Sequence, residues 1–240
     1  MSEFGRTERH ESSREPKEIP IQDALEGRAD LESASETELA QLAEKIELMI
    51  LEVDPTLKPA YRQLLQKIRC LGAQYGAQYD DTLALASEYT VRSKSTEKTL
   101  RLQLQPIANY AELGHLGIEA RTVDRSKSKA YLLCITDEEK GCWINLKFFK
   151  AVLADGSEVS VVYIADRYVI PQLRGEGLGS ALLQVAEGIA RGNQCSAITG
   201  VLVPENPGEA QALQRGMEKA GFSVTKKETG EVIAKKMLPY

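Results

Sequence analysis

The sequence predicts a mixed α/β (α+β) fold, in which a central sheet is flanked by helices and preceded by a helical extension and a disordered tail. Two changes along the chain support this prediction. Residues 1–30 are polar and poor in aromatic side chains, whereas residues 31–98 place apolar side chains every three or four positions, as helices do. From residue 99 to residue 240, short β-rich runs alternate with helical segments. We therefore divide the chain into a tail at 1–30, a helical extension at 31–98 and a main domain at 99–240.

The tail is expected to be disordered, because its few apolar side chains cannot offset the entropy lost on ordering. Such a composition suits an export signal of a translocated protein as well as a plain solubilising extension. The tail lacks the basic, apolar and small-residue order of a secretory signal, and no apolar run approaches the roughly 18 residues of a membrane span. We therefore expect a cytoplasmic protein without a membrane segment.

Two amphipathic helices are predicted in the extension. Ser35 and Glu38 have the spacing of a capping box at the start of the first helix, which Pro55 ends. The second helix is expected over residues 58–79, and a third, weaker one over residues 80–89. These helices favour an extension that packs on the main domain or on itself. The alternative is a module that forms a homodimer or binds a protein partner.

The main domain follows the order strand, helix, three strands, helix, strand, helix, two strands. Asp155-Gly156 is the strongest hairpin signal in the chain, and Gly192 and Gly221 mark the ends of two helices. The closing hairpin turns at Thr229-Gly230. The predicted strands cover residues 100–107, 129–136, 142–154, 158–171 and 195–203 and the hairpin 222–238, and the predicted helices cover 109–120, 180–192 and 207–221.

The composition excludes several classes of function. The cysteines share no metal-ligand or disulfide spacing, and the histidines are His10 and His115, so neither a metal site nor a disulfide framework is expected. A Cys-His nucleophile pair would need His115 and is not expected either. The net charge of −5 is not that of a nucleic-acid binder. We interpret the cysteines as reduced and mostly buried: Cys70, Cys134, Cys142 and Cys195.

Three glycines at alternate positions separate the β-branched run that ends at Pro171 from an apolar-periodic helix. They are Gly175, Gly177 and Gly179. Unpaired N–H groups at the start of a helix bind anions, and glycines let a phosphate approach the main chain, so a pyrophosphate is the expected ligand. A dinucleotide fingerprint requires glycine or alanine where Ser180 stands, and a P-loop requires a G-K-[ST] sequence that is missing. A tight turn that needs glycines only for packing is the alternative.

The run "VIPQLRGEGLGSALL" at residues 169–183 resembles the signature of the GNAT superfamily of acetyl-CoA-dependent N-acetyltransferases, [RQ]-x-x-G-x-[GA] after a strand ending in V-x-P. The resemblance covers about residues 99–240 and includes "EKAGF" before the closing hairpin. It implies that acetyl-CoA lies where the strand ending at Pro171 diverges from the strand at 196–203. The pantetheine arm would pair with the backbone of Val169 and Ile170. The pyrophosphate would lie on the N–H groups of Arg174, Gly175, Glu176, Gly177, Leu178, Gly179 and Ser180.

The resemblance also implies a general base on the strand before the glycines, where many relatives carry Glu or His. This chain has Tyr163 there. Asp166 is one residue out of register and would face the other side of the sheet unless a β-bulge re-aims it; Glu158 is a more distant candidate. The catalytic candidates are therefore Tyr163 and Asp166, although a core tyrosine and a solvated or salt-bridged strand carboxylate are the plainer interpretations.

A second departure from the family's pattern concerns the leaving thiolate. Relatives often place a tyrosine four residues before the glycine of G-F, where it can protonate the thiolate. This chain has Met217, which cannot donate a proton. The thiolate would then leave unassisted, be protonated by water, or use another group such as Tyr163 or Tyr168.

The predicted function is transfer of an acetyl group from acetyl-CoA to an amine by direct attack, without a metal. The acceptor stays open between small molecules and protein amines, because the acceptor pocket is built from the first strand-to-helix region and the last hairpin, which vary freely on one fold. One alternative is a catalytically degenerate GNAT fold that binds acyl-CoA or a protein partner. The other is a helical interaction protein that acts through residues 35–90.

Overall fold

The computed structural model describes residues 17–54, 56–74, 83–202, 207–226 and 232–239. Its strands are β1 (Glu88–Arg92), β2 (Glu97–Pro106), β3 (Lys129–Asp137), β4 (Cys142–Val152), β5 (Glu158–Val169), β6 (Ala197–Leu202), β7 (Ser223–Lys226) and β8 (Val232–Met237). Its α-helices are α1 (Ile21–Leu25), α2 (Glu36–Glu52), α3 (Lys58–Gln74), α4 (Leu178–Gly192) and α5 (Pro207–Lys219), and its 3₁₀ helices are η1 (Ala111–Leu116), η2 (Ala120–Thr122) and η3 (Pro171–Leu173).

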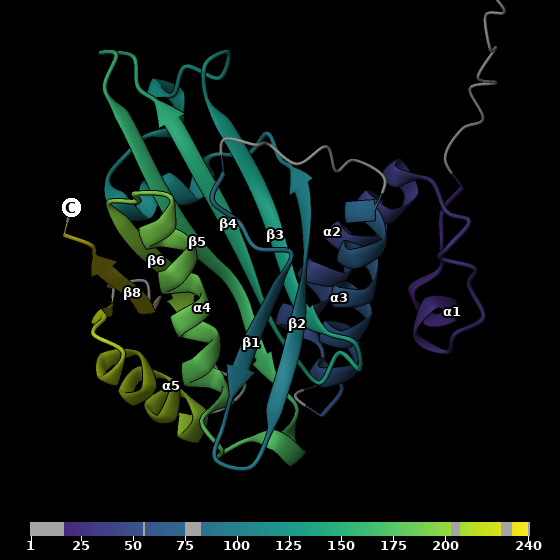
Figure 1. The fold of residues 1–240 in the computed structure, drawn as a ribbon. Helices are drawn as coiled ribbons and strands as arrows, with labels where there is room; N and C mark the ends of the chain where they lie inside the picture. The colour runs from purple at the N-terminus through teal and green to yellow at the C-terminus, as the bar shows by residue number, and fades with distance from the viewer. Residues whose placement is uncertain (1–16, 55, 75–82, 203–206, 227–231, 240) are drawn as a thin grey trace, which may run out of the picture.

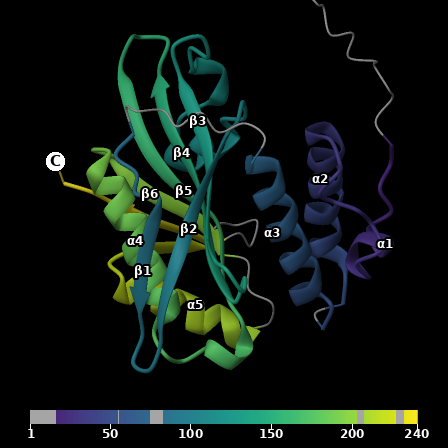
Figure 2. The same cartoon turned by 45° about the vertical axis from the view of Figure 1, so that its right-hand side comes forward.

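The strands form one eight-stranded sheet in the order β1-β2-β3-β4-β5-β6-β8-β7 (Figure 1). Among the described strands, β5 and β6 are the parallel neighbours, and the other neighbouring pairs are antiparallel. Helix α4 lies on one face of this sheet, and α3 with α2 lies on the other (Figure 2). The predicted mixed α/β fold with a flanked central sheet is therefore confirmed.

The element order predicted from residue 99 onward is present in the structure, with one change of helix type. The segment 109–120, expected to be one helix, forms η1 and most of η2, which are short 3₁₀ helices. Gly156 joins β4 to β5 with a φ of +83°, as the Asp155-Gly156 hairpin signal predicts. The turn at Thr229-Gly230 lies outside the described residues.

The structure corrects the N-terminal predictions in three places. The tail was expected to be disordered to about residue 30, yet α1 forms there and Ala24 is buried with Leu31 against the other helices. The weak helix expected over 80–89 is not formed in its described part, residues 83–89. Strand β1 begins at Glu88 instead and pairs with β2. The sheet therefore starts before residue 98, because antiparallel pairing with β2 in a hairpin outweighs the local helical pattern.

The helical extension has a hydrophobic core of its own. The predicted capping box is present: Ser35 Oγ accepts a hydrogen bond from the Glu38 N–H, and the Glu38 carboxylate accepts one from the Ser35 N–H at 2.7 Å. Apolar side chains of the three helices pack together, among them Leu39, Ile46 and Ile68, which are at most 1 % exposed. Within the described residues, no helix combines the length and apolar character that crossing a membrane requires.

The two faces of the sheet are covered by different parts of the chain. On one face, Leu133 and Ile144 of the sheet pack with Leu182 of α4 in the largest core cluster. On the other face, η1 covers one end of the strands, where Leu113 packs with Phe149. Helix α3 covers the remaining part of this second face and contacts β2 and β3 (Figure 2). The extension is thus a layer of the molecule rather than a separate unit.

Candidate active site

Strands β5 and β6 separate part-way along the sheet and leave a cleft between them. They pair in parallel only from Val161 opposite Ala197 to Ile164 opposite Gly200. A Cβ added to Gly200 would be 3.0 Å from the Ile164 carbonyl oxygen, so a larger residue would push the strands apart at this point. Beyond it, β5 continues beside β4 to Val169, and its free edge borders a cavity of about 650 Å³.

The loop between β5 and α4 borders this cavity with Arg174, Gly175, Gly177, Leu178 and Gly179. In the described part of the chain, the N–H groups of residues 175–179 have no hydrogen-bond partner, while those of Arg174 and Ser180 donate to carbonyls within the loop. Gly175 and Gly177 have φ values of +83° and +98°, and a Cβ added to either would meet nothing within 4 Å. Self-packing therefore does not explain the glycines. Unpaired N–H groups at a helix start are suited to an anion.

The edge of β5 next to the loop is partly occupied by the protein itself. The Val169 carbonyl accepts a hydrogen bond from Arg174 Nε at 2.9 Å, and the Ile170 N–H donates to the Gly141 carbonyl at 2.9 Å. The Ile170 N–H is thus directed toward β4. Because the Val169 carbonyl lies on the other side of the same peptide unit, it faces the cleft. Of the two residues expected to pair with a pantetheine arm, Val169 offers the available backbone edge.

The side chain of Glu176 ties the glycine loop to the turn between β1 and β2. Its carboxylate accepts hydrogen bonds from Ser93 Oγ at 3.3 Å and from Ser95 Oγ, and its carbonyl accepts one from the Lys94 N–H at 3.3 Å. Leu178, also in the predicted ligand set, is 1 % exposed, and its side chain anchors α4 in the core. At both positions the side chain holds the loop, so a ligand would use the backbone N–H.

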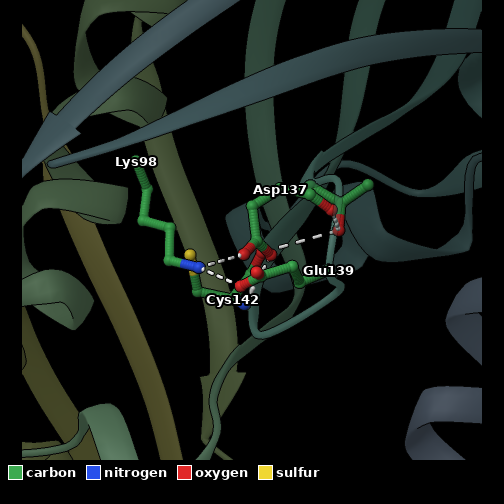
Figure 3. A network of polar contacts seen from close by, with 5 residues as sticks. Lys98, Asp137, Glu139 and Cys142 are labelled. Atoms are coloured by element: carbon green, nitrogen blue, oxygen red, sulfur yellow. Dashed lines mark hydrogen bonds and ion pairs between the residues drawn. The ribbon is translucent and has the colours of Figure 1, made fainter.

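A polar cluster holds the β3–β4 turn beside this loop (Figure 3). Asp137, 3 % exposed, accepts hydrogen bonds from the Cys142 N–H at 2.8 Å and from Lys98 Nζ at 2.9 Å, and Lys98 also pairs with Glu139 at 2.6 Å. Burial, together with the charge of Asp137, raises the pKa of the Cys142 thiol to about 12. A thiol of this kind is not a nucleophile at neutral pH. The cluster is therefore structural and steadies the turn that receives the end of β5.

A β-bulge turns Asp166 toward the cleft. Residues 145–146 of β4 pair with Asp166 and Ile164, so Ala165 is an extra residue in β5 with no partner in β4. Directly opposite residues of an antiparallel pair share a face, so the bulge places Asp166 on the same face as Tyr163. The β-bulge that Asp166 needed in order to face the site is therefore present.

Both catalytic candidates border the cavity, and each has a ring beside it. Asp166 Oδ2 accepts a hydrogen bond from Trp143 Nε1 at 2.8 Å. The ring of Tyr163 stacks on His115, with centroids 5.5 Å apart. From the sequence, His115 was weighed only as a partner for a cysteine. Its stacking contact with Tyr163 joins positions far apart in the chain and leaves no signal in the sequence.

Residues 123–222 match the family model described as the acetyltransferase (GNAT) family. They form a GNAT acetyltransferase domain. This match supports acyl transfer from an acyl-CoA as the general chemistry of the domain. No curated protein sequence matches the chain.

Solved structures similar to this chain include the GNAT domain of S. lividans PAT, with 16 % identity and a TM-score of 0.36 over 63 % of this chain and 97 % of that one. A GNAT acetyltransferase from Listeria monocytogenes shares 13 % identity, with a TM-score of 0.36 over 62 % and 100 % of the two chains. The PaiA N-acetyltransferase from Thermoplasma acidophilum, solved with coenzyme A, has 16 % identity and a TM-score of 0.31 over 45 % and 60 %. These similarities carry no conclusion about activity.

Three further residues that bear on acid or base chemistry in the GNAT domain differ in whether they border the cavity. Tyr168 and Met217 both border the cavity, and both are at most 3 % exposed. Tyr168 stacks on Trp143, with centroids 4.5 Å apart, and Arg174 lies 5.5 Å from the centre of its ring. Glu158 is exposed at the far end of β5 and is not among the residues that line the cavity.

Charges of both signs line the cavity of the GNAT domain. Lys147 forms an ion pair with Glu112, and Arg167 Nη1 donates to the Gly179 carbonyl at 3.0 Å. Burial lowers the pKa of the Arg167 guanidinium, while the negative charge of Asp166 acts in the opposite direction. The cavity is therefore not lined by positive charge alone, and its carboxylates can bind an amine.

Side chains from the helical extension complete the lining of this cavity. Glu47 and Ile50 of α2 border it together with Arg62, Leu65 and Arg69 of α3. None of these residues is a predicted site residue. Their spacing places the three α3 residues on one helix face, which periodicity can detect. Only the tertiary structure shows that this face meets the cleft of the GNAT domain.

Proposed function

We propose that this protein transfers an acetyl group from acetyl-CoA to an amine, either of a small molecule or of a protein, by direct attack of the amine. The N–H groups of residues 175–179 carry the proposal, because they lack hydrogen-bond partners among the described residues and lie in a loop that borders the cavity. Such a row suits the diphosphate of acetyl-CoA. The Val169 carbonyl would hold the pantetheine arm after Arg174 releases it.

The residues around the cleft are suited to the proton transfers of this reaction. Bound acetyl-CoA would supply a thioester-activated acyl group. Asp166 would accept the proton of the amine, directly or through water, because it lies on the cleft side of β5 with one oxygen held by Trp143. Since Met217 cannot protonate the thiolate, water, Tyr163 or Tyr168 would do so. Positioning of the two reactants would supply much of the rate.

Calorimetry with matched glycine variants tests the ligand site. Gly177→Val should abolish binding of coenzyme A, because its side chain fills the space above the N–H groups, while the circular dichroism spectrum stays that of the wild type. Gly156→Val is the control, since Gly156 has a similar positive φ and equally open surroundings but lies in the β4–β5 turn. Unchanged affinity of Gly177→Val for coenzyme A would remove the proposal.

The acceptor can be identified without prior choice. The purified protein is incubated with acetyl-CoA and a pool of small metabolites or of peptides, and acetylated products are found by mass spectrometry. We expect an acetylated amine whose appearance matches the release of coenzyme A. Products acetylated on oxygen, or acetylation that proceeds equally without the protein, would contradict amine transfer.

A second candidate function is binding of acyl-CoA without turnover. Met217, in the position where relatives often carry the thiolate-protonating tyrosine, favours it. The two candidates differ in one measurement, because a binding protein releases no coenzyme A in response to amines. Amine-dependent release by the wild-type protein, lost in Gly177→Val, would exclude the binding-only alternative.

A further inference from the structure

The helix pair α2–α3 precedes the matched GNAT residues in the chain but lies against the cleft. Glu47, Arg62 and Arg69 from these helices border the same cavity as the glycine loop and Asp166. The segment between β2 and β3, which includes η1 and η2, contributes only Glu112 to the cavity lining within the described residues. The wall opposite the catalytic face of β5 is therefore supplied mainly by the extension.

A buried hydrogen bond determines where α3 sits on the sheet. Asn145 Nδ2 donates to Gln66 Oε1 at 2.6 Å, and neither residue is more than 1 % exposed. Asn145 is directly opposite Asp166 in the β4–β5 pairing, so this bond anchors α3 beside the catalytic candidate. Arg69 follows Gln66 by three residues and lies on the same helix face, one turn farther along. The anchor thus brings Arg69 to the position of Asp166.

Arg69 borders the same cavity as Asp166, whose carboxylate accepts a hydrogen bond from Trp143. The Arg69 side chain is 13 % exposed, its Nη2 donates to Glu47 Oε1 at 2.7 Å, and its charge interacts with that of Asp166. Burial works against the charged guanidinium, but the carboxylates of Asp166 and Glu47 outweigh burial and raise the pKa of Arg69. Arg69 is therefore a cation that links α3 to α2 through Glu47, and it borders the cavity near enough to the Asp166 carboxylate for the two charges to interact.

We propose that Arg69 is a positioning residue of the acceptor pocket, and that α2–α3 forms the wall of that pocket. This inference rests on the proposed function, since it assigns Arg69 a role through Asp166 in the same reaction. The guanidinium holds the carboxylate in the orientation in which it can accept the amine proton, and Glu47 holds the guanidinium. The extension is then part of the catalytic unit and is not a separate interaction module.

Kinetics on the full-length protein test the proposal with Arg69→Ala, Arg69→Lys and the control Arg28→Ala. Arg28 precedes the extension and pairs with Asp23 of α1, and both side chains are exposed. With acetyl-CoA and the metabolite and peptide pool, Arg69→Ala should lower amine-dependent coenzyme A release by at least about tenfold while acetyl-CoA affinity stays within about twofold. Arg69→Lys should restore part of the rate, and Arg28→Ala should match the wild type.

A spectroscopic measurement tests the role of Arg69 without relying on turnover. Trp143 is the single tryptophan of the chain, so its indole N–H gives one signal in a ¹⁵N–¹H spectrum and reports on the bond to Asp166. We expect Arg69→Ala to move this signal and Arg69→Lys to move it less. A wild type that binds no acetyl-CoA would refute the proposed function. A wild type that binds and transfers, with Arg69→Ala equally active and its indole signal unchanged, would refute the role of Arg69 alone.

Discussion

Asp166 shares its face of β5 with Tyr163 because Ala165 interrupts the pairing with β4. Without that insertion the carboxylate would be on the face that packs against α4, where an unpaired charge is strongly unfavourable. On the cleft face it accepts a hydrogen bond from Trp143 and interacts with Arg69. A single bulged position thus decides whether this strand carries a carboxylate on its cleft face.

Replacement of the Asp166 carboxylate should separate chemistry from binding. Asp166→Asn keeps an oxygen for Trp143 but cannot take up the amine proton, so amine-dependent coenzyme A release should fall about 10²–10⁴-fold with unchanged acetyl-CoA affinity. Stopped assays of thiol release and calorimetry measure the two quantities. Glu158→Gln, on the exposed end of the same strand, serves as control and should match the wild type. Full turnover in both Asp166→Asn and Tyr163→Phe would disprove the assigned roles.

At the scale of elements, α3 is joined to the sheet by one buried amide pair. Gln66→Ala should destabilise the protein by about 1–3 kcal/mol, because it leaves the Asn145 amide buried without its acceptor. Urea unfolding measures this change. Gln63→Ala, an exposed position on α3, should change stability by less than about 0.5 kcal/mol. Equal effects of the two substitutions would mean that the amide pair does not secure the helix.

A second pair of elements, α4 and β8, is joined by Glu187 and Lys236, which are 2.7 Å apart. The hydrogen bond from Lys236, helped by Arg191, lowers the pKa of Glu187 in the folded protein. A carboxyl whose folded pKa is depressed stabilises the fold at neutral pH, and this contribution is lost as the pH falls through the acidic range.

The stability of Glu187→Gln should therefore depend on pH in a defined way. Its melting temperature should lie below that of the wild type at neutral pH, and the two should converge as the pH falls through the folded pKa of Glu187, where the carboxyl becomes protonated in the folded as well as the unfolded state. Differential scanning calorimetry across this range checks the expectation, with Glu44→Gln, an exposed glutamate of α2, as control. A difference that stays constant with pH would assign the effect to packing instead of charge.

At the scale of the whole molecule, ligand binding should be visible as added stability. Acetyl-CoA at one hundred times its dissociation constant should add about 2.7 kcal/mol, which corresponds to a rise in melting temperature of about 5–10 °C for a chain of this size. Thermal denaturation with and without acetyl-CoA measures the shift. Gly177→Val should show no shift and Gly156→Val a full one. A shift of the same size in Gly177→Val would place the ligand outside the glycine loop.

Much of the main domain was predictable because its signals are local. The β5–α4 glycine loop, the Asp155-Gly156 hairpin and the capping box at Ser35 each involve residues close in sequence. The site was only partly predictable. Tyr163 and Asp166 could be named from the resemblance, but the place of Arg69 at the cavity and the stacking of His115 on Tyr163 depend on how segments far apart in the chain pack together.

The amino-acid sequence by itself determined which segments are helices or strands in most of the domain and where a glycine loop leaves backbone N–H groups without side chains above them, because periodicity and turn chemistry act between neighbouring residues. Only the tertiary structure decided that β1 joins the sheet, that Ala165 is an insertion relative to β4, and that α3 closes the cleft. The position of α3 depends on contacts between distant segments, whereas β1 and the Ala165 insertion depend on strand pairing within hairpins. In each case the free energy comes from burying one surface against another, which leaves no periodic mark on the segment.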